Sequence, residues 1–94
     1  MFMKDVIAVR AVQDNHLELE FEDGVKGVID IRKAIRGFDG VFAPLRNPEF
    51  FRQVRLAPEL GTICWPNGAD LDPDMLYALT AGQPLLVGGE RVFN

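Results

Sequence analysis

The sequence predicts an α+β fold in which an antiparallel three-stranded meander and a second β-hairpin are packed by short connector helices and a C-terminal helix. Three observations predict it: apolar and polar residues alternate strictly over 16–22, two short apolar runs flank a turn at 58–61, and a helix-start pattern occupies 72–74. The 94 residues fit one domain, with a core of about 4–82 and an apolar tail at 83–94.

The first meander begins with residues 5–12, which are rich in β-branched side chains. The next strand, HLELEFE, places leucine and phenylalanine on one face and histidine and glutamate on the other. The two strands join near Asp14-Asn15, and a third strand, VKGVIDI, follows Asp23-Gly24. This arrangement predicts one buried and one exposed sheet face.

The register of the second turn follows from which loop keeps apolar residues opposite one another. A two-residue loop would set Phe21 opposite Lys26, an apolar side chain against a charge. A three-residue loop with Gly24 in the left-handed region instead sets Leu17 opposite Ile29. We therefore predict a bulged hairpin.

The middle of the chain predicts short elements. Residues 31–37 can form a helical turn ended by Gly37, and FDGVFAPL is predicted as an irregular connector that carries aromatic residues. Asn47 caps a one- to two-turn helix with Pro48 at its first position. The second hairpin is expected to have strands at about 53–57 and 61–65.

The C-terminal helix is predicted over 73–81, because Asp72 is a good N-cap, Pro73 suits the first helical position and Gly82 lies just past the end. Together these elements predict a core of eight apolar residues: Leu17, Leu19, Phe21, Ile29, Ile63, Trp65, Leu76 and Leu79.

The loop WPNGAD leaves two interpretations open. It is a strand-to-helix corner with an Asn-Gly turn and Trp65 in the core, or it is a recognition site, since polar groups there converge beside a large aromatic residue. In the second interpretation the recognition residues are Trp65, Asn67, Gly68, Asp70 and Tyr77.

Aspartates at 70, 72 and 74 alternate as at the start of a calcium-binding loop. The pattern breaks at Met75, where that loop needs glycine, and at Ala81, where it needs a bidentate glutamate. We predict no metal site.

Several runs of the chain resemble a family of small bacterial domains, domain of unknown function 2442: W-P-N-G-A-D-L-x-P-D-x-L-Y at 65–77, F-E-D-G-V at 21–25 and V-F-A-P-L-R-N-P at 41–48. The resemblance covers about residues 4–80 and implies a compact α+β domain. Some relatives carry a helix-turn-helix domain after this module, which implies a regulatory or accessory role. Only about a dozen residues follow Gly82, too few for a helix-turn-helix, so direct DNA reading is not expected. The resemblance supplies no catalytic residue.

Charge is distributed unevenly along the chain. The net charge is −4, which disfavours non-specific nucleic-acid binding. Six of the ten basic residues nevertheless lie within 31–55, with only two of the fourteen acidic ones. This basic face is either a solvated surface or a docking face for an acidic partner or a nucleic acid, and its residues are Arg32, Lys33, Arg36, Arg46, Arg52 and Arg55.

The residue inventory disfavours an enzyme. The chain has no serine, one histidine and one cysteine, so it cannot build a Ser-His-Asp triad, and zinc lacks its usual ligands. No phosphate-binding glycine motif is present, and we predict no cofactor. The N-terminus lacks a secretory signal and no apolar run could span a membrane, so a cytoplasmic protein is expected.

The leading functional hypothesis is a non-enzymatic protein-interaction or regulatory accessory module, such as the partner in a toxin–antitoxin-like pair. A protein partner or self-association is expected, with the apolar tail packed on the domain or buried by a second copy or another protein. The alternative is a small-molecule sensor with its ligand near Trp65, Asn67 and Asp70. Nucleic-acid binding through the basic face is less favoured.

Overall fold

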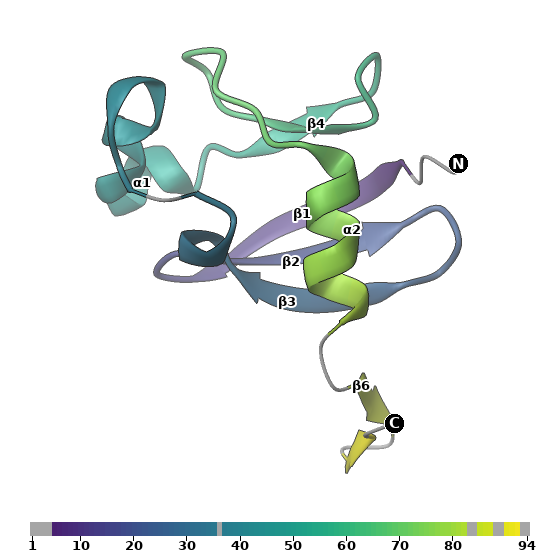
Figure 1. The fold of residues 1–94 in the computed structure, drawn as a ribbon. Coiled ribbons are helices and arrows are strands. Elements are labelled where there is room, and N and C mark those ends of the chain that lie inside the picture. The colour runs from purple at the N-terminus through teal and green to yellow at the C-terminus, as the bar shows by residue number, and fades with distance from the viewer. Residues whose placement is uncertain (1–4, 36, 83–84, 88–89, 93–94) are drawn as a thin grey trace.

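The computed structural model describes residues 5–35, 37–82, 85–87 and 90–92, and it confirms the α+β prediction. Figure 1 shows the elements along the chain. They are β1 (Val6–Gln13), β2 (His16–Phe21), β3 (Lys26–Asp30), the 3₁₀ helices η1 (Ile31–Lys33) and η2 (Gly40–Arg46), α1 (Pro48–Phe51), β4 (Arg55–Ala57), β5 (Thr62–Cys64), α2 (Pro73–Ala81), β6 (Leu85–Val87) and β7 (Glu90–Val92).

The first sheet has the order β1-β2-β3, and each neighbouring pair is antiparallel. Leu17 lies opposite Ile29, and the predicted bulged hairpin is confirmed. Gly24 has a φ of 93°, and the Phe21 N–H donates to the Val25 carbonyl at 2.8 Å. The apolar alternation of β2 therefore set the register, because a slip of one residue would bury its glutamates.

Helix α2 lies across one face of this sheet (Figure 1). Leu76 and Thr80 point inward and are both 0% exposed. The contact with β3 is close at Gly27, where a Cβ atom would lie 3.2 Å from the Thr80 methyl carbon. The absence of a side chain at Gly27 thus lets the helix approach the strand.

The second hairpin, β4 and β5, is shorter than predicted, with three residues in each strand. It lies beside β1, where the Val6 N–H donates to the Gly61 carbonyl at 3.0 Å. Gly61 has a φ of 68°, and a Cβ atom there would collide with the Asp5 carboxylate. The turn between β4 and β5 therefore needs glycine at position 61, both for its positive φ and for the space beside Asp5.

The connector between the two sheets is more regular than predicted. The expected turn at 31–37 is the 3₁₀ helix η1, and the segment predicted as irregular contains η2. Pro44 inside this seven-residue 3₁₀ helix has no backbone N–H, so one hydrogen bond of the helix is missing there. The α1 prediction is confirmed, with the Asn47 side chain accepting from the Glu49 N–H at 2.9 Å.

Seven of the eight predicted core residues are buried, including Trp65 at 1% exposure. Leu79 differs: it is half-buried and packs at the edge of the core. Residues of the connector and the loop before α2 complete the core, among them Leu45, Phe51 and Leu71.

The predicted burial of the apolar tail is not tested, because the side chains of 83–94 lie outside the described residues. Within that tail, β6 and β7 pair with each other. In the described part of the chain, no helix is both long enough and apolar enough to cross a membrane.

Candidate functional site

The buried indole of Trp65 connects two segments of the protein through a hydrogen bond. Its Nε1–H donates to the Phe51 carbonyl at 3.0 Å, and the two rings lie 6.1 Å apart, tilted by 33°. This bond joins the end of β5 to the end of α1 and satisfies a polar group that burial would otherwise leave unpaired. Trp65 is therefore unavailable to a ligand at the surface.

Asn67 and Gly68 form the corner that follows. The Asn67 amide nitrogen donates to the Val41 carbonyl at 2.9 Å, and its oxygen accepts from the Ala69 N–H at 3.1 Å. Gly68 has a φ of 89°, and its N–H donates to the Trp65 carbonyl at 2.9 Å. These bonds account for Asn67 and Gly68 as a strand-to-helix corner that is also tied to η2.

Tyr77 lies apart from this corner. Its hydroxyl donates to the Asp23 carboxylate at 2.6 Å, and its ring meets Phe21 edge-on with centroids 5.0 Å apart. The hydrogen bond to Asp23, followed by desolvation, raises the pKa of Tyr77 above its ordinary value. Tyr77 thus fastens α2 to the β2–β3 turn and is not brought together with Asn67.

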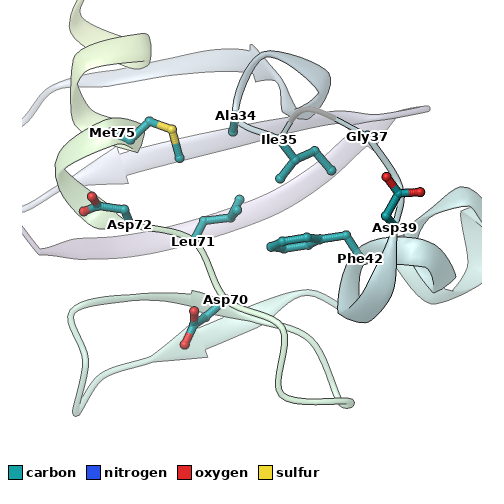
Figure 2. Close-up of a pocket in the computed structure, with 9 residues that line it drawn as sticks. All are labelled: Ala34, Ile35, Gly37, Asp39, Phe42, Asp70, Leu71, Asp72 and Met75. Carbon is teal, nitrogen blue, oxygen red and sulfur yellow. The ribbon is translucent and has the colours of Figure 1, made fainter.

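Asp70 is the predicted loop residue whose side chain is exposed and makes no hydrogen bond to any residue that the structure describes. It lies at the rim of an open hollow of about 450 Å³ between the connector and the loop before α2. Figure 2 shows this acidic hollow and its lining, which consists of Ala34, Ile35, Gly37, Asp39, Phe42, Asp70, Leu71, Asp72 and Met75.

The acidic hollow combines an apolar floor with carboxylates around it. The side chains of Ile35, Phe42 and Leu71 converge in Figure 2, and Asp39, Asp70 and Asp72 lie around them on different sides. One oxygen of Asp72 accepts from the N–H of the residue two positions later at 2.9 Å and so caps α2. An apolar group fits this floor, because the floor removes apolar surface from water. In the view of Figure 2 the three carboxylates point away from the floor, so they would attract a cation at the rim of the hollow.

The connector half of the hollow was missed by sequence reasoning. Ile35, Asp39 and Phe42 are about 30 residues from Asp70, and no local pattern joins them. The available signal was the aromatic and acidic content of a connector that had no predicted regular structure. Only packing brings the two segments together.

The six residues of the predicted basic face differ in their surroundings. Arg32 bonds to the Asp30 carboxylate at 2.6 Å, and this hydrogen bond lowers the pKa of Asp30 to about 2. Arg36 lies outside the described residues. The remaining four are exposed but belong to separate elements, namely η1, η2, the end of α1 and β4, and they are Lys33, Arg46, Arg52 and Arg55.

The single histidine and the single cysteine of the chain, which a catalytic Cys-His pair would need side by side, lie on different sheets. The His16 ring bonds to the Asp14 carbonyl at 2.8 Å in the β1–β2 turn, and Cys64 ends β5. Among the described residues, no three histidine, cysteine, aspartate or glutamate side chains are grouped as a metal site would require.

Comparison with known families places these features in context. The family model described as Protein of unknown function (DUF2442) matches residues 6–82, which include the first sheet, the connector, the acidic hollow and α2. Comparison with curated proteins and with solved structures gave no match. The resemblance seen in the sequence is thereby confirmed at the level of the family. Because the model covers more than half of the chain, this protein belongs to the DUF2442 family.

Proposed function

We propose that this chain is a non-enzymatic protein-interaction module with a regulatory accessory role, and that it binds its partner in the acidic hollow. The observation that carries the proposal is the apolar floor of Ile35, Phe42 and Leu71 beside the carboxylates of Asp39 and Asp70. A module of this kind would serve as one half of a regulatory pair, such as a toxin–antitoxin-like system.

The chemistry of the hollow specifies the partner segment. A leucine or methionine side chain would bury against the floor, while a neighbouring lysine or arginine would approach one of the carboxylates at the rim. The volume of about 450 Å³ suits one or two side chains better than a whole domain. The lining residues include no histidine, cysteine, serine or lysine, which supports binding over covalent chemistry.

The test is an affinity pull-down from bacterial lysate, read by mass spectrometry. The bait variant is Asp39→Asn with Asp70→Asn, which removes two charges and keeps side-chain size. The matched control is Asp14→Asn with Glu59→Gln, which removes two exposed charges in turns outside the hollow. Asn67 is left intact because it holds the corner together.

We expect a partner that is retained by wild type and by the control and is lost with the hollow variant. Retention by all three proteins would show that the hollow is not the binding surface. If wild type captures nothing, the interaction role itself is contradicted.

A second candidate is the sensing of a small cationic molecule in the same hollow. Its volume lies within the roughly 300–1,000 Å³ range of ligand pockets. In a thermal-shift screen, a cationic metabolite that binds in the hollow should raise the unfolding temperature of wild type. The same metabolite should leave the unfolding temperature of the Asp39→Asn, Asp70→Asn variant unchanged. A flat screen on wild type would remove this candidate.

A further inference from the structure

The two edges of the first sheet differ in what lies beside them. The β1 edge is next to the second hairpin, and its Val6 N–H donates to Gly61 at 3.0 Å. Strand β3 ends the sheet on the other side, and Figure 1 shows no strand beside it. A strand edge of this kind presents backbone donors and acceptors that can pair with another chain.

The ladder shows which backbone groups of β3 point outward. The Phe21 N–H donates to the Val25 carbonyl at 2.8 Å, and the Ile31 N–H donates to the Asn15 carbonyl at 2.7 Å. In an antiparallel pair, alternate residues bond to the same neighbour, so 25, 27, 29 and 31 all face β2. The backbone groups of 26 and 28 therefore face the open edge, as does the N–H of Asp30, whose carbonyl begins the first turn of η1.

The side chains at these outward positions form a self-complementary pattern. Lys26, Val28 and Asp30 share the sheet face opposite to buried Ile29, and Val28 is 39% exposed. A two-fold axis through Val28 would place Lys26 of each copy opposite Asp30 of the other and the two valines opposite each other.

We propose that β3 pairs antiparallel with β3 of a second copy of this chain about an axis through Val28, joining the two three-stranded sheets into one continuous sheet. The central Val28 pair exchanges both of its N–H···O bonds, and in each outer pair the Asp30 N–H donates to the Lys26 carbonyl, because the Asp30 carbonyl begins η1. An opposite-charge pair at each end fixes the register, because a shift by two residues would lose both of them. The occupant is a second copy because the charge pattern matches its own reverse. The Asp30 carboxylate also bonds Arg32 of its own copy at 2.6 Å, so Lys26 of the other copy would share it with that arginine.

The opposing explanation is that Lys26 and Asp30 protect the edge. Charged residues on a short edge strand are a common means of preventing pairing. The two explanations predict opposite oligomeric states, so the state in solution decides between them. The β3 edge and the acidic hollow have no residue in common, so the proposed function does not depend on this pairing.

The test is sedimentation equilibrium of the full chain across a range of concentrations. We expect wild type to be a dimer at high concentration and to dissociate reversibly on dilution. Val28→Pro removes the outward N–H without touching the ladder to β2, and it is expected to give a monomer. The matched control, Val28→Thr, keeps the N–H and a β-branched side chain and is expected to dimerise.

A second variant guards against a failure of Val28→Pro to fold. Lys26→Glu sets like charges opposite Asp30 and is expected to raise the dimer dissociation constant by about tenfold. Arg55→Glu makes the same charge change on β4 and should leave that constant unchanged. Circular dichroism confirms that each variant is folded. A wild type that stays monomeric throughout, or a folded Val28→Pro that still dimerises, would overturn the proposal.

Discussion

The two halves of the segment 65–77 contain similar residue types and differ in what those residues contact. Over 65–69, the indole and the Asn67 amide bond to backbone carbonyls of the protein itself. Over 70–75, side chains line the acidic hollow, and Asp70 is exposed. The polar and aromatic groups of 65–69 thus make contacts within the protein itself. The second part, 70–75, which the sequence pattern explains as a helix start, contributes the exposed surface of the acidic hollow.

The largest expected effect is in the first half. Trp65→Ala should lower the free energy of unfolding by about 3–5 kcal/mol, because it leaves a cavity and removes the bond to Phe51. Urea denaturation followed by circular dichroism measures it. Trp65→Phe is the control and should lose about 1–3 kcal/mol, because the Phe51 carbonyl then lacks its donor. A loss under about 1 kcal/mol for Trp65→Ala would contradict the structural role.

The corner residue is expected to come next. Asn67→Ala removes two hydrogen bonds and should lower the free energy of unfolding by about 1–2 kcal/mol. Asn67→Asp keeps the acceptor for Ala69 and loses the donor to Val41, so its loss should be smaller. If Asn67→Ala and wild type are equally stable in urea denaturation, Asn67 has no structural role and is again a candidate recognition residue.

In the second half of the segment 65–77, Asp72 stabilises α2 as its N-cap. Asp72→Ala should lower the free energy of unfolding by about 1 kcal/mol. Asp72→Asn retains a capping oxygen and should stay close to wild type in the same urea measurement. If both variants lose the same amount, a contribution other than the cap is at work.

Asp70 is expected to differ from Asp72 in its effect on stability. Because its side chain is exposed and bonds to no described residue, Asp70→Ala should change the free energy of unfolding by less than about 0.5 kcal/mol. Partner binding should nevertheless weaken in the pull-down. A stability loss that matches Asp72→Ala would instead mark Asp70 as part of the turn, and the contrast between the halves would disappear.

The smallest effect concerns Tyr77 at the end of the segment. Its pKa is raised above 10.0 by the bond to Asp23, so the bond stabilises the fold below that pH and is lost as the pH rises through the folded-state pKa. Since this is the only tyrosine, the ultraviolet absorbance of tyrosinate reports it directly. Asp23→Asn should shift the titration to lower pH, and an unshifted curve would remove Asp23 as the cause.

Local patterns predicted the elements whose partners are near in sequence. The β2–β3 register followed from alternation and Gly24, and the start of α2 followed from Asp72 and Pro73. Predictions failed where the determining contact is distant. The 3₁₀ helix at 40–46 was expected to be irregular, and its Val41 carbonyl is bonded by Asn67 from across the chain.

The sequence by itself determined the fold class, the register of the first sheet, the caps and most of the core, because periodicity and capping act over a few residues. Only the tertiary structure decided which groups remain open. The pairing of Trp65 with Phe51 and the meeting of Phe42 with Leu71 in one hollow both join segments that have no local relation. The physical reason is that burial and hydrogen-bond satisfaction depend on what lies nearby in space, and distant parts of the chain supply those neighbours.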